Sequence, residues 1–185
     1  MFLGKHGYEP DSVDLQLLKL LQEDCKIPLA KLGEAVGMSA PSVMERVRKL
    51  EAAGVIKGYK ALIDARRVGL DITAFIGVNI NYPKAIDEFE AAVAQIPAVL
   101  ECHHVTGAHT MLLKIRTENT ASLEKLISQI RATPGVDRTE TMIVLSTQTE
   151  RTELTFEVET ARSNEEEAPK SRMRAARRTE GEHVS

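Results

Sequence analysis

The chain has 185 residues, a length that fits one large domain or two small ones, and 43% of them are hydrophobic against 28% charged. With a mean hydropathy of −0.19, this composition favours a soluble protein with a substantial core. Aromatic residues make up only 4% and Trp is absent, which argues against base-stacking platforms and sugar-binding clefts.

The sequence shows no sign of membrane insertion or secretion. No apolar run reaches the roughly 18 residues of a membrane helix, and the N-terminus lacks an apolar signal core. The two cysteines, Cys25 and Cys102, cannot form a disulfide framework. We therefore expect a cytoplasmic protein with no membrane partner.

The net charge of −3 is unevenly distributed along the chain. Residues 1–66 carry ten basic and nine acidic side chains, residues 67–160 carry eight and thirteen, and residues 161–185 carry six and five. A basic domain is the usual mark of a nucleic-acid-binding protein, so the total charge argues against one. Because only the middle segment is strongly acidic, each segment has to be judged separately.

The first segment contains three helical patterns. Ser12 can cap a helix that ends near Asp24, and Pro28 begins a short helix that Gly37 ends. Ser39 caps a third helix that runs to about Ala53. Two helices joined by a tight turn predict a helix-turn-helix, whose last helix lies in the DNA major groove. Residues 55–64 then have the composition of a strand.

Residues 72–150 have a different pattern of apolar residues. Alternating residues predict strands over 72–81, 98–105, 110–116 and 136–149, and helical spacing appears between them around 86–96 and 123–130. The order β-α-β-β-α-β is that of ferredoxin-like folds, so we expect an α+β protein with a helix-turn-helix domain and a ferredoxin-like domain. Two helices should cover one face of the antiparallel sheet, and the other face should pair with a partner.

The domain boundaries follow from these patterns. We expect an N-terminal extension over 1–10, the helix-turn-helix domain with its strand over 11–64, a linker over 65–71 and the ferredoxin-like domain over 72–150. Residues 151–185 form a charged tail that we expect to be disordered from about 161.

The predicted third helix has a polar face that can read DNA. At 100° per residue, its apolar residues point one way and its cations, a hydroxyl and a carboxylate point the other. Arg46 lies nearer the core edge, so it suits a backbone phosphate or an internal ion pair, and two lysines on the following strand can add phosphate contacts. The alternative is a three-helix bundle with solvated charges. The candidate DNA contacts are Ser39, Pro41, Ser42, Glu45, Arg46, Arg48, Lys49, Lys57 and Lys60.

The stretch MSAPSVMERVRKLEAAGVIKGYKALID resembles the recognition helix and linker of the Lrp/AsnC (leucine-responsive regulatory protein) family. The resemblance extends over residues 11–150, from the leading VDLQLLKLLQED to the later ECHHVTG. It implies a DNA-binding transcriptional regulator that has a winged or a simple helix-turn-helix domain and a ferredoxin-like effector domain. It also implies that effector-domain sheets pair into homodimers, which often assemble into octamers.

The resemblance places an effector, usually an amino acid, near the loop between the second and third strands of that domain. The typical loop reads Gly-Asp-aromatic-Asp, whereas here it reads Gly107-Ala108-His109-Thr110. Carboxylates partner an α-ammonium group, so their replacement favours a different amino-acid-like or keto-acid effector, with His109 and Thr110 donating to its carboxylate. A loop that has lost its ligand is the alternative. The resemblance also implies lining residues His104, Thr120, Met142, Ile143 and Val144, and Thr139 and Thr141 can add hydroxyls.

Other functions find less support in the sequence. Cys102 and His104 share a strand face, but His103 faces the opposite side, so we expect no metal site. No nucleophile–base arrangement and no phosphate-binding glycine loop appears, so we expect neither an enzyme nor a cofactor. A small-molecule-sensing interaction module without DNA regulation is the remaining alternative.

Overall fold

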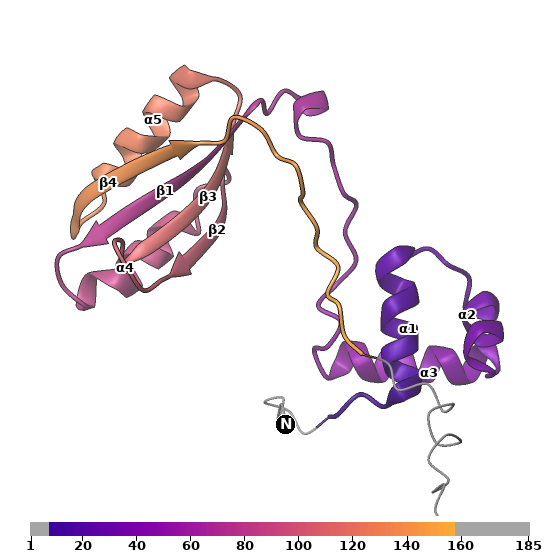
Figure 1. Cartoon of the computed structure of the whole chain (residues 1–185). Coiled ribbons are helices and arrows are strands. Elements are labelled where there is room, and N and C mark those ends of the chain that lie inside the picture. Colours follow the sequence, from indigo (N-terminus) through magenta and orange to yellow (C-terminus); the bar gives the residue numbers. More distant parts are fainter. Residues whose placement is uncertain (1–7, 158–185) are drawn as a thin grey trace, which may run out of the picture. The chain divides into compact units, whose positions relative to one another are not determined.

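In the computed structural model, residues 8–157 are described, and the chain forms two compact units. Of the described residues, 8–59 and 152–157 belong to one unit and 60–151 to the other (Figure 1). The first boundary thus falls about five residues before the predicted one, and residues 152–157 belong with the first unit. Most of the N-terminal extension and the predicted disordered tail lie outside the described residues.

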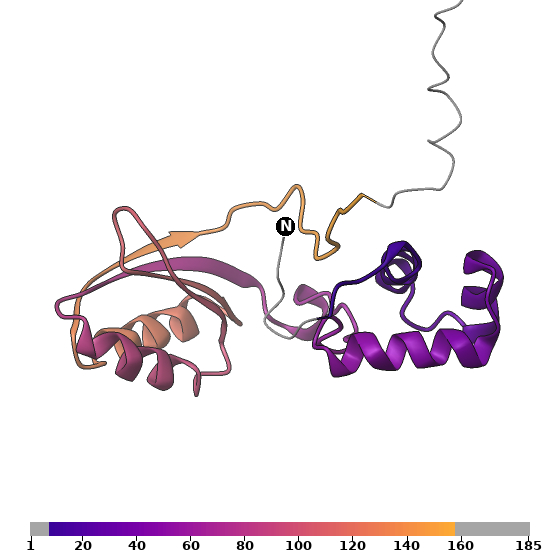
Figure 2. The same cartoon turned by 90° about the horizontal axis from the view of Figure 1, so that it is seen from below.

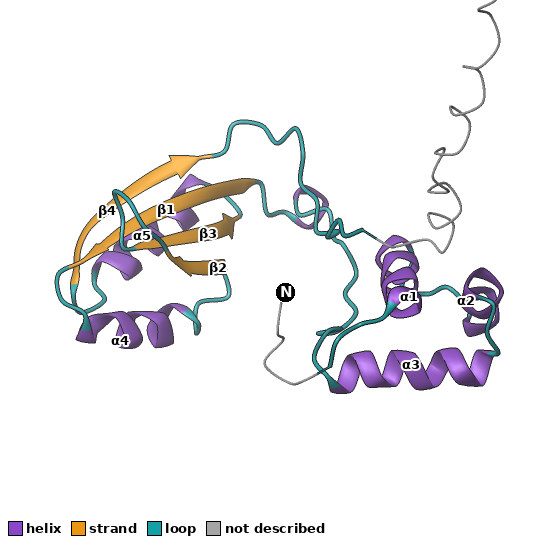
Figure 3. Ribbon diagram, turned by 60° about the horizontal axis from the view of Figure 1, so that its bottom comes forward, coloured by secondary structure: helices purple, strands orange, loops and turns teal. Residues whose placement is uncertain are grey.

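The first unit contains three helices, α1 (Ser12–Glu23), α2 (Leu29–Val36) and α3 (Ala40–Ala52) (Figure 3). Leu17, Leu32 and Val43, one from each helix, are fully buried against one another and form its core. The cap of α1 differs from the prediction. Asp11, not Ser12, accepts from the backbone N–H of Asp14 at 2.8 Å, and the Asp14 carboxylate in turn accepts from the backbone N–H of Asp11.

Two glycines shape the helix-turn-helix. Gly37 ends α2 with φ +68°, which L side chains rarely adopt. Gly33 lies inside α2, where a Cβ would come within 2.4 Å of the Met38 carbonyl oxygen. Ser39 then caps α3 as predicted, because its side chain accepts from the backbone N–H of Ser42. Gly33 is therefore required by the close approach of α2 to the turn, and Gly37 by its left-handed backbone conformation.

The strand predicted over 55–64 is wrong, since these residues form no ladder. Their β-branched and aromatic side chains suit a strand, but within residues 8–157 no neighbouring strand pairs with their backbone. A short 3₁₀ helix, Arg66–Val68, follows before the sheet begins.

The second unit is a four-stranded antiparallel sheet with two helices, and the predicted β-α-β-β-α-β order is confirmed. The strands lie in the order β2-β3-β1-β4. Their bounds are Ile72–Ile80 for β1, Val99–His104 for β2, Met111–Thr117 for β3 and Val136–Ile143 for β4, with α4 at Lys84–Val93 and α5 at Thr120–Arg131. The last strand ends six residues before the predicted position 149, after Val144 donates one further hydrogen bond to Thr73.

The two faces of the sheet differ in what covers them. Both helices lie on one side (Figure 2), over a core that includes Ala74, Ile76 and Val78 of β1 and Phe89 of α4. The intervening residues of the strands point to the open face, which the helices leave uncovered. Among the described residues, no helix has the length and apolar character that crossing a membrane requires.

Candidate functional site

The polar face of α3 is exposed along its length. Pro41, Met44, Glu45, Arg48 and Lys49 are all exposed, while Val43 and Leu50 are fully buried on the opposite side. This division matches the face predicted from the sequence and adds Met44, which we did not include among the candidate contacts. The start of this helix offers mainly side chains, because Pro41 has no N–H and the backbone N–H of Ser42 donates to the Ser39 hydroxyl.

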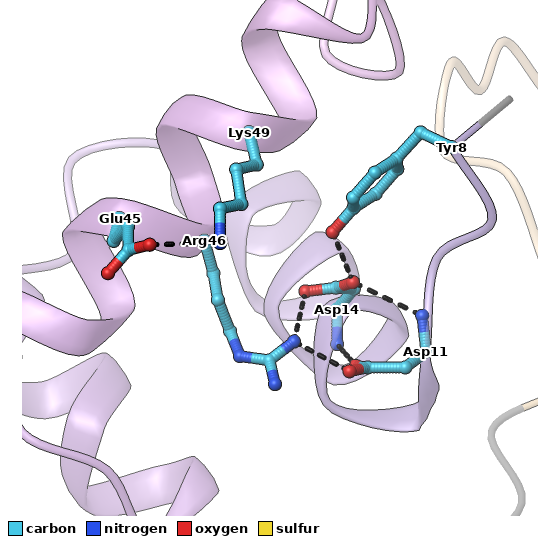
Figure 4. Close-up of polar contacts among 6 residues, drawn as sticks. All are labelled: Tyr8, Asp11, Asp14, Glu45, Arg46 and Lys49. Carbon is cyan, nitrogen blue, oxygen red and sulfur yellow. Dashed lines mark hydrogen bonds and ion pairs between the residues drawn. The ribbon is translucent and has the colours of Figure 1, made fainter. Parts of the chain in front are cut away.

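Arg46 points away from that face. Its guanidinium donates to Asp11 at 2.7 Å and to Asp14 at 2.9 Å, and Asp14 is almost fully buried (Figure 4). The Tyr8 hydroxyl donates to the same Asp14 carboxylate at 2.7 Å, a bond that raises the pKa of Tyr8 to about 12. Of the two roles predicted for Arg46, the structure shows the internal ion pair, which joins α3 to α1.

Lys49 and Glu45 form an ion pair on the exposed face, with Lys49 Nζ 2.9 Å from Glu45 Oε1. The hydrogen bond from Lys49 holds the pKa of the Glu45 carboxyl below its ordinary value. Among the described residues, Arg48 has no ion-pair partner. The reading face thus presents one free guanidinium beside an ammonium that already pairs with a carboxylate.

The remaining candidate DNA contacts have different surroundings. Ser42 is half-buried, and its hydroxyl lies 2.9 Å from that of Ser39. Lys57 is exposed and belongs to the same unit as α3, whereas Lys60 belongs to the other unit. The candidates that α3 exposes are therefore Pro41, Glu45, Arg48 and Lys49, whereas Arg46 is held in an internal ion pair and Lys60 belongs to the other unit.

In the second unit, His109 lies over the open face of the sheet. A Cβ at Gly77 would meet the His109 ring at 2.3 Å, so the imidazole lies directly on that glycine. Its Nδ1 is 3.0 Å from Asn79 Oδ1, and its Nε2 is 3.6 Å from Glu140 Oε2. The β2–β3 loop is fixed at its other end by Thr110, whose hydroxyl accepts from the backbone N–H of Ile80 at 3.3 Å.

The other residues expected around an effector do not share one face. Register pairs Thr139 with Val78 and Thr141 with Ile76, so both hydroxyls lie on the helix-covered side, where Thr139 accepts from Arg131 at 2.7 Å. Met142 pairs with Phe75 and lies on the open face. Gly107 has φ +116° at the loop tip. The rest of the predicted set is spread over strand ends, loop and helix start, namely His104, Ala108, Thr120, Ile143 and Val144.

Sequence reasoning missed Glu140, which places a carboxylate beside the loop that had lost its acids. Glu140 lies opposite Gly77 in the β1–β4 register, which only the strand pairing reveals. It also missed a charge cluster at the open face, where Glu150 pairs with Lys114 at 2.7 Å and Arg116 at 3.1 Å. The hydrogen bond from Lys114 lowers the pKa of Glu150.

Over residues 8–157, no group of three or more His, Cys, Asp or Glu side chains is arranged to hold a metal ion. Cys102 lines a shallow pocket of about 280 Å³ between α4 and β2, with Glu90, Val93 and Leu100 among its other lining residues. Burial raises the pKa of the Cys102 thiol. This environment disfavours the thiolate that binds metals.

Two protein-family models match the chain. The AsnC-type helix-turn-helix domain matches residues 11–51, and the Lrp/AsnC ligand binding domain matches residues 73–154. The chain belongs to the Lrp/AsnC family of helix-turn-helix transcriptional regulators.

Relatives of this Lrp/AsnC protein are similar over most of their length. An HTH-type transcriptional regulator FL11 from Pyrococcus horikoshii is 39% identical over 144 residues, covering 78% of this chain and 95% of the relative. A leucine-responsive regulatory protein from Rhizobium meliloti is 40% identical over 140 residues, covering 74% and 90%. These relatives are transcriptional regulators, and the family is not one of enzymes.

Solved structures of two similar proteins contain an amino acid. The feast or famine regulatory protein from M. tuberculosis, complexed with L-methionine, is 32% identical with a TM-score of 0.74, covering 79% of this chain and 99% of that chain. A transcriptional regulator from Neisseria meningitidis, in an L-Met complex, is 29% identical with a TM-score of 0.74, covering 78% and 96%.

Proposed function

We propose that this Lrp/AsnC regulator reads DNA with the exposed face of α3, placed in the major groove. The observation that carries the proposal is the division of α3 into a buried apolar side and an exposed side that bears Glu45, Arg48 and Lys49. Arg48 suits a guanine, which accepts two hydrogen bonds from a guanidinium, and the Glu45 carboxylate suits the amino group of a cytosine. Ser39, Pro41 and Ser42 approach the backbone at the helix start, and Lys57 adds a phosphate contact.

Arg46 takes a different part in this proposal. Since its guanidinium is held by Asp11 and Asp14, it sets the position of α3 on α1 and leaves the base contacts to its neighbours.

The test is a binding titration with the DNA upstream of the protein's own gene and an unrelated duplex of equal length. We expect the wild-type chain to prefer the upstream DNA and Arg48→Ala to lose that preference. Equal binding of both duplexes by the wild type would contradict a sequence-specific regulator and favour the interaction module.

We further propose that the second unit binds a small amino-acid-like effector near the β2–β3 loop. Glu140 supports this, because its half-exposed carboxylate beside His109 can accept from an α-ammonium group that the loop itself has no acid to hold. The L-methionine complexes of two relatives make L-methionine the first compound to test.

A matched pair of compounds separates the two effector classes. L-Methionine should raise the melting temperature of the wild-type chain, and its 2-keto analogue should raise it less if Glu140 holds the ammonium group. In Glu140→Gln the difference between the two compounds should vanish. An equal or greater shift with the keto acid would instead support the His109 and Thr110 donors as the main contacts, and no shift with either would mean a loop without a ligand.

The proposed assembly is a homodimer through the open sheet faces, with octamers built from dimers. Phe75, Leu112 and Met142 supply apolar surface on that face, and Met142 remains 44% exposed in the single chain. A dimer would place two α3 helices on the two halves of a roughly palindromic site.

A further inference from the structure

Met44 is a large apolar side chain on the polar face of α3. It is 36% exposed, whereas Val43 and Leu50 of the same helix are fully buried. The apolar side chains that pack against the core of Leu17, Leu32 and Val43 do not include Met44. Over residues 8–157, packing of the helical unit therefore does not account for a methionine at this position.

Met44 lies within the face that we propose reads DNA. Pro41, Met44, Glu45 and Arg48 follow one another at i, i+3, i+4 and i+7, the spacing of residues that share one side of a helix, and all of them are exposed. Met44 is in the N-terminal half of α3, which begins at Ala40. The N-terminal residues of a recognition helix are those that contact base edges. Met44 therefore occupies a position from which a side chain reaches the bases.

The chemistry of methionine restricts what Met44 can recognise in the groove. Its thioether has no hydrogen to donate and is only a weak acceptor, so it does not satisfy the hydrogen-bonding groups on the base edges. The 5-methyl group of thymine is the apolar group that the major groove presents, and apolar side chains contact it. Methionine is also unbranched and flexible, so its end adapts to the position of a partner. Thymine is thus the base whose edge an exposed methionine fits.

The rise of α3 limits where such a thymine lies. Met44 precedes Arg48 by one helical turn, which is about 6 Å along the helix axis. Successive base pairs of B-DNA are about 3.4 Å apart. For a helix that lies along the groove, the bases that these two side chains meet are therefore about two base pairs apart.

We propose that Met44 binds the methyl group of a thymine in the major groove, about two base pairs from the guanine that Arg48 contacts. The contact removes apolar surface of both partners from water, and it favours a T·A pair without a hydrogen bond from Met44. Loss of one methyl group from such a contact should weaken binding about 4-fold. This inference rests on the proposed function, because Met44 meets a base only when α3 lies in the major groove.

The test replaces each thymine of the upstream DNA in turn by deoxyuridine, which pairs with adenine in the same way but lacks the 5-methyl group. We expect one thymine in each half-site whose replacement weakens binding of the wild-type chain about 4-fold. At that position, a C·G pair with 5-methylcytosine should bind more tightly than one with unmodified cytosine, because it restores the methyl group. Undiminished binding of every deoxyuridine duplex overturns the proposal.

Variants of Met44 then test the side chain against the same duplexes. Met44→Ala should bind the thymine and deoxyuridine duplexes equally, whereas Met44→Leu, which keeps an apolar side chain, should retain the difference. Leu29→Ala is the matched control, because Leu29 is 37% exposed on α2, away from the reading face, and this variant should also retain the difference. An undiminished difference in Met44→Ala overturns the proposal, because another side chain then binds the methyl group.

Arg48→Ala in the same titrations separates this inference from the proposed function. Suppose that the wild type prefers the upstream DNA and Arg48→Ala loses that preference, while no deoxyuridine duplex binds more weakly. This result contradicts the Met44 contact alone. Equal binding of the upstream and unrelated duplexes by the wild type contradicts both proposals. The deoxyuridine scan of the wild-type chain does not depend on how any variant folds.

Discussion

Two arginines on α3, two positions apart, have opposite environments. Arg46 is bonded to Asp11 and Asp14, while Arg48 is exposed and has no ion-pair partner among the described residues. The periodicity of the sequence separates an inward from an outward side, and it correctly placed Arg46 at the core edge. It could not choose between a phosphate and an ion pair, because the partner carboxylates lie 32 and 35 positions away in the chain.

The first prediction replaces each of these two arginines with alanine, in two separate variants. Arg48→Ala should weaken DNA binding by about 10-fold or more and leave the free energy of unfolding unchanged. Arg46→Ala should lower the free energy of unfolding by about 1–3 kcal/mol, because it leaves the buried Asp14 carboxylate without its cation, a cost reduced by the partial exposure of the pair. Fluorescence anisotropy and urea unfolding measure the two effects, and the reverse pattern would mean that the reading face is misplaced.

The second prediction concerns Glu45, whose carboxylate forms an ion pair with the ammonium group of Lys49. In Glu45→Gln, Lys49 is released for a phosphate, so affinity for unrelated DNA should rise and its salt slope should steepen by about 1. Preference for a cytosine at one position of the site should weaken at the same time. Glu51→Gln, which removes an acid near the end of the same helix, serves as the control. Equal gains in both variants would indicate only a change in net charge.

The third prediction follows from the lowered pKa of Asp11. Its carboxylate accepts from the backbone N–H of Asp14 and from Arg46, which holds its pKa below the ordinary value of 3.8. A lowered pKa in the folded state stabilises the fold above 3.8 and loses that contribution as the pH falls below it. An Asn side chain can still cap the helix, so Asp11→Asn removes only the charge, and the variant should be less stable than the wild type at neutral pH by at most about 1 kcal/mol, with the difference shrinking in acid. Urea midpoints at several pH values measure it, and a constant difference would contradict the assignment.

At the scale of elements, the contact between the β2–β3 loop and β1 depends on the absence of a side chain at Gly77. The His109 ring occupies the space where a Cβ would be, between Asn79 and Glu140. The loop is thus positioned by an imidazole lying on the sheet, and not by its turn alone.

The fourth prediction tests this contact. Gly77→Ala should displace His109 and lower the free energy of unfolding by about 1–3 kcal/mol, as overpacking does. The same change should cost much less in a His109→Ala background, because the ring is then absent, and the two costs give a coupling energy. Chemical unfolding of the four proteins measures the cycle. Equal costs in both backgrounds would show that β1 itself, and not the ring, rejects the methyl group.

The helices and strands were predicted correctly where the pattern of buried residues along the element itself determines it. Alternation in β1 and the helical spacing of α4 and α5 identified the core face correctly, because burial sets both periods. The prediction failed over 55–64 and after Ile143, where strand-forming side chains meet no partner strand in the part of the chain that the structure describes. The pairing of Glu140 with Gly77 and the return of residues 152–157 to α1 depend on register and long-range hydrogen bonds, which no local pattern encodes.

At the scale of the whole molecule, the net charge of −3 no longer argues against DNA binding. The acidic excess lies in the segment that forms the sheet unit, and the reading helix depends on the placement of individual cations. A single reading unit with so few free cations should bind weakly and with strong salt dependence, so useful affinity requires two or more linked units.

The fifth prediction concerns a variant that should separate the two paired chains at the open face of the sheet. Leu112 lies opposite Gly77 on this face, so Leu112→Lys places a charge where we propose that a second sheet packs. The variant should sediment as a monomer, and its affinity for the upstream DNA should fall by about 100-fold or more, because binding of the second unit is no longer intramolecular. Glu124→Lys, an exposed change on α5 that also adds positive charge, should leave assembly and affinity unchanged. A Leu112→Lys chain that remains dimeric would place the interface elsewhere, whereas a monomer with undiminished affinity would show that a single α3 and its flanking cations suffice for DNA binding.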